Sequence, residues 1–418
     1  RLRATLKALE QTGLPMLTQR LAALAASLIA ICAALSPVQA AYEAEFRAFL
    51  AGKVAPAARA AGVPQAVIDQ ELAGLTPDEK LPGLSRPDRP EAPPAVNFQA
   101  EFKAPGGYFQ DKQFRALAGP GRSLMQKHGA TLKAVEARYG VPARIIVAIW
   151  GRETGYGAAK IPHDGLRVVA TRAFMGERRE FFLGETVAAL QILADGHITR
   201  AELKSSWGGA MGQPQFLPSS FLKYAVDFDG DGRRDIWRSV PDTLASIANY
   251  LSQHGWERGR DWGYEVVLPP SVSCSREGPD QQQAVSRFVR EGVTRVRGRE
   301  FPKAELGKPA NILMPAGRHG PAFLATANFY VLKAYNESDV YALFVGHLAD
   351  RYGRDEGFAA NWDPTPHLSR GAVRDLQLKM QKAGYDVGKP DGLIGFKTRR
   401  SLGLMQEKAG RRATCWLE

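Results

Sequence analysis

The sequence has only three cysteines and, beyond its first forty residues, no long apolar run. A membrane-spanning helix needs about 20 consecutive apolar residues, so we expect no stable membrane anchor in the rest of the chain. Lys and Arg are scattered and form no dense basic run, which argues weakly against a dedicated nucleic-acid binder. The phosphate-binding pattern GxxxxGK[ST] is absent as well, so the glycine-rich stretch at 205–220 does not indicate a nucleotide site.

The composition is otherwise that of an ordinary globular protein, with 44% hydrophobic and 23% charged residues. Its 418 residues are enough for two or three domains. The net charge of +12 suits a polyanionic partner: nucleic acid, anionic lipid or an acidic cell-wall polymer.

Residues 1–40 have the pattern of a secretory signal peptide. Arg20 precedes an apolar stretch, and small residues near Ala40 provide a cleavage site. We expect residues 1–19 to be an upstream extension of this signal. Cys32 raises the alternative of a lipoprotein, but Ile31 stands before it where such sites need a small residue. The pattern therefore predicts an exported, soluble mature protein.

Removal of the signal leaves Cys274 and Cys415. They lie in different predicted domains, so a disulfide between them is possible but has no support in the sequence.

The stretch 142–157 organises the chain. Pro142 suits the first turn of a helix, the run 145–150 is almost wholly apolar, and Gly155 and Gly157 can end the helix. We expect this helix to be buried on most sides. Glu153 shares a helical face with apolar residues three, four and seven positions earlier, so its carboxylate projects from the apolar stripe.

Two interpretations of Glu153 remain open at this point. It is either a helix-end carboxylate that reaches water or pairs with an arginine such as Arg152, or a carboxyl that partial desolvation keeps protonated for use as a general acid. The stretch alone does not decide between them.

The segment 227–235 matches an EF-hand calcium loop. Aspartates occupy positions 1, 3, 5 and 9, glycine occupies position 6, and position 7 would give a backbone carbonyl; the candidate ligands are Asp227, Asp229, Asp231, Arg233 and Asp235. Position 12 is Arg238 and not the usual Glu, and Asp242 could complete the shell. A solvated Asp/Gly turn is the alternative. A single loop outside the cytoplasm favours a structural calcium ion over a sensor.

Between 262 and 327 the pattern changes to short strands at 264–268, 293–296, 312–314 and 323–325 with one helix at 283–290. We read this as a small α+β insertion between helical segments, and expect one continuous helix from 328 to 352. The segment 76–107 is rich in Pro and is expected to lie irregularly over the surface, or to be a flexible linker. Residues 362–368 are expected to link to a separate small module at 369–418.

Several motifs in order resemble the lytic murein transglycosylase B family. They are Gly151-Arg152-Glu153-Thr154-Gly155-Tyr156-Gly157, Gly209-Ala210-Met211-Gly212 with Gln215-Phe216-Leu217-Pro218-Ser219-Ser220, Tyr224-Ala225-Val226-Asp227, Ala248-Asn249-Tyr250 and Tyr335-Asn336. The tail resembles a peptidoglycan-binding module, through its Leu-Gln, Gly-Tyr and Asp-Gly-x-x-Gly-x-x-Thr pattern.

The resemblance implies a mainly α protein: a lysozyme-like helical catalytic domain over 41–361, with the α+β insertion, and a small helical peptidoglycan-binding domain. It implies cleavage of the β-1,4 bond between N-acetylmuramic acid and N-acetylglucosamine in peptidoglycan glycan strands, without water, to give 1,6-anhydromuramyl ends. Glu153 would be the only catalytic carboxylate, as acid and then base. The resemblance implies a periplasmic monomer with no organic cofactor, no nucleic-acid partner and a structural Ca²⁺ ion.

By motif position the resemblance also assigns substrate-binding residues. These are Arg178, Arg179, Ser206, Gln215, Tyr250, Tyr335, Asn336 and Tyr341. For each, ordinary packing or solvation is the alternative. One departure concerns the loop beside Gln215: Gln213-Pro214 stands where the family commonly has Tyr-Gly, and Pro fixes φ and removes a donor. A hydrolytic muramidase and a non-catalytic wall-binding protein remain the competing functions.

Overall fold

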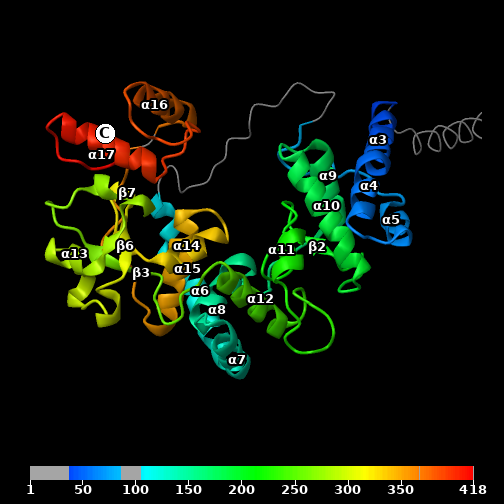
Figure 1. The fold of residues 1–418 in the computed structure, drawn as a ribbon, viewed down its shortest axis with the longest axis horizontal. Helices are drawn as coiled ribbons and strands as arrows, with labels where there is room; N and C mark the ends of the chain where they lie inside the picture. The colour runs from blue at the N-terminus through cyan, green and yellow to red at the C-terminus, as the bar shows by residue number, and fades with distance from the viewer. Residues whose placement is uncertain (1–36, 86–104, 367, 418) are drawn as a thin grey trace, which may run out of the picture.

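The computed structural model describes residues 37–85, 105–366 and 368–417. Helices dominate it (Figure 1). The α-helices are α3 (Pro37–Phe49), α4 (Ala55–Ala60), α5 (Gln65–Leu72), α6 (Asp111–Lys127), α7 (Gly129–Tyr139), α8 (Ala143–Thr154), α9 (Gly165–Met175), α10 (Arg179–Ala194), α11 (Pro218–Tyr224), α12 (Val240–Gln253), α13 (Val285–Arg290), α14 (Ala327–Ala334), α15 (Asp339–Gly353), α16 (Arg370–Lys382) and α17 (Phe396–Lys408). The strands are β1 (His163–Asp164), β2 (Lys204–Ser205), β3 (Gly263–Val267), β4 (Gln283–Ala284), β5 (Thr294–Arg295), β6 (Pro309–Leu313), β7 (Pro315–Arg318) and β8 (Ala322–Ala325).

Helix α8 lies at the centre of the main hydrophobic core. Every residue from Ile145 to Gly151 is buried, and the helix packs against α6, α7, α12 and α15. An apolar helix of this kind is stable only when other helices cover all its sides. Pro142 stands at the N-cap, and Gly155 ends the helix in the left-handed conformation at φ 55°. The prediction of a buried helix that begins after Pro142 and ends at Gly155 is confirmed.

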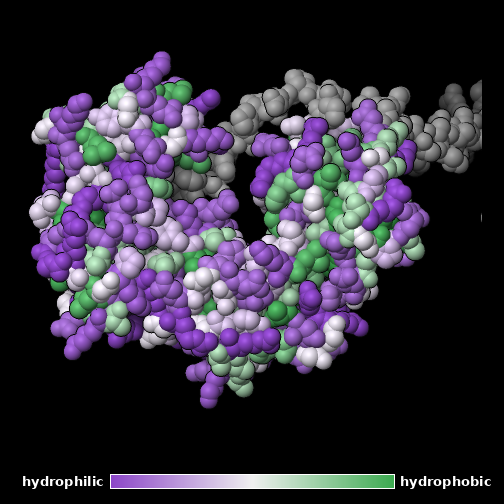
Figure 2. All heavy atoms as spheres, in the orientation of Figure 1, coloured by the Kyte–Doolittle hydropathy of each residue, from purple (hydrophilic) through white to green (hydrophobic). Residues whose placement is uncertain are grey.

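A second core joins the N-terminal helices to α9, α10 and α11. Its largest fully buried side chains include Phe46, Ile68 and Phe221. In Figure 1 the N-terminal helices stand with α9 and α10 opposite the body that contains α6, α14 and α15, and α11 and α12 lie between the two. Figure 2 shows a hollow between the two groups, with hydrophilic residues along much of its edge.

The predicted α+β insertion is present as a five-stranded sheet in the order β4-β6-β8-β3-β5. Its neighbouring strands pair antiparallel, for example with Tyr264 opposite Leu324 and Ile312 opposite Leu324. The side chains of these three residues are buried in one small core. Strand β7 was not predicted, because proline and glycine are rare inside strands and β7 contains both Pro315 and Gly317.

The expectation of one continuous helix from 328 to 352 is wrong. The chain leaves α14 after Ala334 and enters α15 at Asp339. Glu337 adopts a left-handed conformation at φ 58°, which a helix does not accommodate. Ser338 caps the new helix, because its hydroxyl accepts a hydrogen bond from the Tyr341 backbone N–H.

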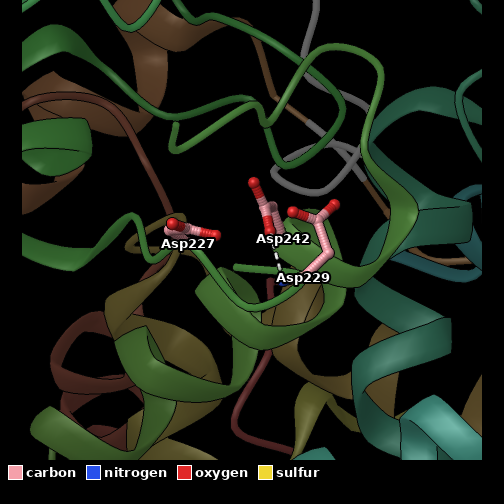
Figure 3. A group of neighbouring side chains, drawn as sticks. All are labelled: Asp227, Asp229 and Asp242. Atoms are coloured by element: carbon pink, nitrogen blue, oxygen red, sulfur yellow. Dashed lines mark hydrogen bonds between the residues drawn. The ribbon is translucent and has the colours of Figure 1, made fainter. Parts of the chain in front are cut away.

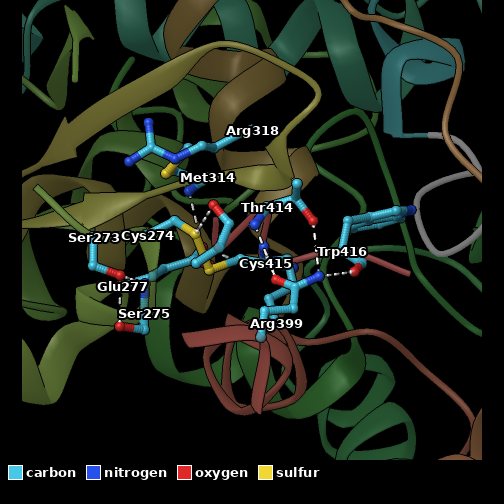
Figure 4. Close-up of a disulfide and its surroundings, with 12 residues drawn as sticks. Ser273, Cys274, Ser275, Glu277, Met314, Arg318, Arg399, Thr414, Cys415 and Trp416 are labelled. Carbon is cyan, nitrogen blue, oxygen red and sulfur yellow. Dashed lines mark hydrogen bonds and ion pairs between the residues drawn. A yellow bond between two sulfur atoms is a disulfide. The ribbon is translucent and has the colours of Figure 1, made fainter. Parts of the chain in front are cut away.

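The C-terminal helices α16 and α17 enclose their own small core, which includes Met380, Leu402 and Trp416. This part is fastened to the sheet region by a disulfide between Cys274 and Cys415 (Figure 4). The buried Arg399 guanidinium also pairs with the buried Glu277 carboxylate, at 2.6 Å from Nη2 to Oε1. The sequence left open whether the two cysteines pair, and the structure shows that they form a disulfide.

Two predicted segments fall mostly beyond the described residues: the signal peptide of 1–40 and the irregular segment of 76–107. The described start of the latter lies against α9, since Arg167 donates to the carbonyls of Thr76 and Pro77. Within the described ranges, none of the helices has the length and apolar character that crossing a bilayer requires.

Candidate functional site

Glu153 lies in the last turn of α8. The apolar run before it is buried and keeps the helix fixed, while the left-handed Gly155 turns the chain away immediately afterwards. Tyr156 then folds back over the helix end, and its hydroxyl donates to the Leu117 carbonyl at 2.6 Å. A Cβ on Gly151 would stand 2.7 Å from the Tyr156 ring, so glycine is needed for this close approach.

The Glu153 carboxyl group is only partly exposed, and this burial raises its pKa to about 7. Two weaker influences oppose the shift: a hydrogen bond from the Tyr341 hydroxyl to Oε1, at 2.5 Å, and the positive charge of Arg152. Burial disfavours the charged form of a carboxyl, whereas a donor or a cation favours it. Near neutral pH the group is therefore divided between its acid and base forms, as proton transfer in both directions requires.

Among the described residues, no other carboxylate shifts the pKa of Glu153. Enzymes that hydrolyse glycosidic bonds with two carboxylates hold them about 5–9.5 Å apart. Glu153 is therefore the carboxyl that is hydrogen-bonded to a tyrosine of this site, whereas the Glu337 charge acts on Tyr250 and not on Glu153.

Three of the predicted binding residues form one aromatic cluster beside Glu153. The rings of Tyr335 and Tyr341 are stacked, with 6.3 Å between centroids, and those of Tyr335 and Tyr250 are 4.8 Å apart. The Glu153 charge contributes to raising the pKa of both Tyr335 and Tyr341, after the larger effect of burial. The break between α14 and α15 is what brings Tyr335 and Tyr341 to the same place.

The glycine-rich loop approaches the same cluster. The Tyr335 hydroxyl donates to the Pro214 carbonyl at 2.8 Å, and the Phe216 ring lies 6.0 Å from the Tyr335 ring. Gln215, between these two residues, has the left-handed φ of 56° and donates from Nε2 to the Gly212 carbonyl. Its side chain is half-buried. A non-glycine residue in this conformation is strained and is held there by its surroundings.

Gln213 is a positioning residue that the sequence did not reveal. Its Oε1 accepts from the Trp150 indole at 2.8 Å, and its backbone carbonyl accepts from the Thr154 hydroxyl at 2.9 Å. Both partners belong to α8, one on each side of Glu153. The residue pair Gln213-Pro214, which cast doubt on this loop, thus connects α8 to the tyrosine cluster. The only signal in the sequence was the departure from the family pattern.

The other predicted binding residues are not joined to Glu153 by any contact in the described part of the chain. Ser206 closes its own loop, because its hydroxyl accepts from the Ala210 backbone N–H. Asn336 is exposed between α14 and α15. Arg178 and Arg179 are exposed at the start of α10, and the Arg178 guanidinium lies 3.9 Å from the Phe181 ring centroid. Their role in substrate binding stays a prediction.

Three of the predicted metal ligands lie together: Asp227, Asp229 and Asp242 each offer a carboxylate oxygen within 4.8 Å of the others (Figure 3). Burial raises the pKa of Asp242, whose oxygens accept from the backbone N–H groups of Phe228, Asp229 and Asp235. An all-oxygen carboxylate set is the chemistry that a hard cation such as Ca²⁺ prefers, so the residues present fit that ion.

The remaining predicted ligands lie outside this group. Asp231 accepts from the Arg233 backbone N–H at 2.8 Å. Asp235 is turned toward Arg238, whose Nε donates to its carboxylate at 2.7 Å. Arg238, at the position where an EF-hand has its glutamate, thus holds one of the predicted ligands in an ion pair.

The chain is similar in sequence to proteins of one known family. The profile of the family described as "Transglycosylase SLT domain" matches residues 45–350. The membrane-bound lytic murein transglycosylase B of Escherichia coli (strain K12) is 36% identical over 214 residues, which is 50% of this chain and 56% of that protein. The chain therefore spans about half the length of this curated relative.

Solved structures are similar over more of the chain. SltB3 from Pseudomonas aeruginosa, in complex with NAG-NAM-pentapeptide, is 35% identical with a TM-score of 0.77, over 89% of this chain and 97% of SltB3. The Escherichia coli lytic transglycosylase Slt35, in complex with calcium, is 29% identical with a TM-score of 0.50, over 59% of this chain and 76% of Slt35.

Proposed function

The chain belongs to the transglycosylase SLT-domain family, and from this premise we propose that it is a lytic transglycosylase of peptidoglycan. It cleaves the bond between N-acetylmuramic acid and N-acetylglucosamine without water and leaves 1,6-anhydromuramyl ends. The observation that carries the proposal is the single, half-buried Glu153 carboxyl with a pKa of about 7 beside the Tyr341 hydroxyl. The structure of the similar SltB3 with NAG-NAM-pentapeptide supports the substrate class.

Glu153 performs two proton transfers in this reaction. As the acid it donates its proton to the glycosidic oxygen while the bond to the muramyl C1 breaks, and positive charge develops on that sugar. As the carboxylate it then takes the proton of the muramyl 6-hydroxyl, whose oxygen bonds to C1. Glu153 ends in its starting form, and no water is consumed. The Tyr341 hydroxyl occupies Oε1 and so leaves the other carboxyl oxygen to carry the transferred proton.

The proposal extends to the arrangement of the chain. We assign residues 41–361 to the catalytic domain, 362–368 to a linker and 369–418 to a peptidoglycan-binding domain, with the signal of 1–40 directing export to the periplasm. The three clustered carboxylates of Asp227, Asp229 and Asp242 hold a structural Ca²⁺ ion. The calcium complex of the similar Slt35 supports this ion. A bound cation there would fasten the 227–242 loop to α12, far along the chain from the acid.

Digestion of purified sacculi by the protein from Ala41 onward tests the function. Mass spectrometry of the soluble products should show muropeptides 18 Da lighter than those of a hydrolase, because water is not added. Glu153→Gln should abolish release while binding to sacculi persists. Reducing muramyl ends would instead indicate a hydrolytic muramidase. Absence of any release, with equal sacculus binding by both proteins, would leave only a wall-binding role.

A further inference from the structure

A cavity of about 370 Å³ lies away from Glu153, where the sheet region meets the C-terminal part of the chain. Its apolar lining includes Val266 and Val267 of β3 together with Met314. Its cationic lining consists of Arg297, Arg318 at the end of β7, and Arg412. Small-ligand sites in proteins have volumes of about 300–1,000 Å³, mostly apolar linings and a few placed polar groups. The cavity has each of these properties.

Two of the three arginines form no ion pair with an acidic residue of the described ranges. Arg297 pairs with Glu356 at 3.6 Å, whereas no ion pair with a described residue is found for Arg318 or Arg412. Arg318 donates from Nη2 to the Val272 carbonyl at 2.6 Å, but its buried Nε has no hydrogen-bond partner in the described part of the chain. A buried donor without an acceptor is destabilising. The cavity therefore presents a guanidinium with unused hydrogen-bonding capacity.

The two unpaired arginines also repel each other. Burial lowers the pKa of Arg318, and the charge of Arg412 lowers it further. The Glu407 carboxylate opposes this effect, but it is itself engaged by the hydroxyls of Ser273 and Ser275. Like charges held close together are destabilising unless an anion lies between or beside them.

The fold forces this proximity. The Arg318 backbone N–H donates to the Thr414 carbonyl at 2.9 Å, so the segment that carries Arg412 lies along β7. A Cβ on Gly317 would stand 2.3 Å from the same Thr414 oxygen. The Cys274–Cys415 bond fastens this segment three residues after Arg412, and Figure 4 shows Arg318, Thr414 and the disulfide in one view.

We propose that this cavity is a binding site for the carboxylate-ended peptide of peptidoglycan, separate from the catalytic site. The carboxylate contacts Arg318 and Arg412, and the alanine methyl groups of the peptide pack on Val266, Val267 and Met314. The choice of this ligand rests on the proposed function. An anion alone would need no apolar wall, and an apolar ligand alone would leave the two guanidinium groups unpaired.

Binding of a synthetic probe tests the proposal: di-N-acetyl-L-lysyl-D-alanyl-D-alanine and its C-terminal amide, titrated into the full chain by calorimetry. The acid should bind with one saturable site, and the amide about tenfold or more weaker, because a charge-assisted hydrogen bond is worth about 1.5–3 kcal/mol. Arg412→Gln should reduce acid binding to the level of the amide. Arg411→Gln removes the same charge from the neighbouring, exposed residue, does not line the cavity, and should bind like wild type.

Equal affinity for the acid and the amide, or an Arg412→Gln protein that binds like wild type, would overturn the proposal. Displacement of the acid by inorganic phosphate at equal affinity would also overturn it, since the site would then recognise any small anion. Because the probe contains no glycosidic bond, its binding does not depend on catalysis. Failure of this inference and failure of the lytic activity are therefore seen in different experiments.

Discussion

Burial and hydrogen bonding act in opposite directions on the carboxyl group of Glu153, and burial prevails. The folded-state pKa of about 7 lies above the ordinary value of 4.5 for a glutamate, so the native protein binds this proton more tightly than the unfolded chain. The group's contribution to stability is present below pH 4.5 and is lost as the pH rises to 7.

Replacing Glu153 with Gln should remove that loss. At 1.36 kcal/mol per pKa unit, the unfolding free energy of Glu153→Gln relative to that of the wild type is expected to rise by up to roughly 3 kcal/mol between pH 4 and pH 8. Urea unfolding of both proteins at the two pH values measures the gain. An unchanged difference in unfolding free energy would show that the carboxyl ionises as freely in the folded protein as in the unfolded chain.

The Tyr341 hydroxyl stabilises the ionised form of Glu153, so its removal should raise the pKa of that carboxyl above 7. For Tyr341→Phe we expect the alkaline limb of the kcat/KM profile on sacculi to move to higher pH, with a loss of rate of about tenfold. Tyr330→Phe is the matched control, because it removes a half-buried hydroxyl that donates to Asn311 outside the site. An unshifted limb in Tyr341→Phe would rule out this hydrogen bond in the active enzyme.

At the scale of elements, the break between α14 and α15 positions both Tyr335 and Tyr341. Ser338→Ala removes the cap of α15. It should lower the stability by about 1 kcal/mol and should also reduce lytic activity. Ser369→Ala removes the equivalent cap of α16 and should cost a similar stability with no loss of activity on small glycan substrates. Thermal melts and product release measure both effects. Equal activity losses would mean that the break does not govern the site.

The loop from Asp227 to Asp242 offers a second test at this scale. Ca²⁺ in hundredfold excess over its dissociation constant should stabilise the protein by about 2.7 kcal/mol relative to EDTA, seen as a higher Tm. Asp229→Asn should abolish the difference, since Asp229 belongs to the three-carboxylate group. Asp231→Asn should retain it. Loss in both variants would restore Asp231 as a ligand, as the EF-hand pattern predicted.

Local signals account for what the sequence could predict. Pro142, the apolar run and Gly155 lie within fourteen residues of one another, and they were enough to locate α8 and to single out Glu153. The α+β insertion followed equally from strand-like runs. The break at Glu337 was missed although Ser338 is a typical N-cap residue, whereas the contact of Tyr341 with a residue nearly 190 positions earlier could not be predicted from any local pattern. The role of Gln213 was hidden for the same reason, as its partners lie in another helix.

At the scale of the whole molecule, the Cys274–Cys415 bond fixes the C-terminal part onto the sheet. It spans 141 residues, and loops of this length gain roughly 2–5 kcal/mol from a disulfide. Reduction of the wild type should lower the unfolding free energy by that amount. A Cys274→Ser, Cys415→Ser protein should start at the lower value and not respond to reductant. If the unfolding free energy of the wild type equalled that of the double variant and did not change with reductant in mild urea, this prediction would be contradicted.

The same bond closes part of the chain into a covalent ring and leaves the rest as a tail. Residues 274–415 form the ring, which carries Tyr335 and Tyr341, while Glu153 and the aspartate loop belong to the tail. A protease that cuts once inside the ring leaves a single molecule until a reductant is added, whereas one cut in the tail separates two fragments at once. Gel mobility with and without reductant would therefore tell which half of the site a nick has entered.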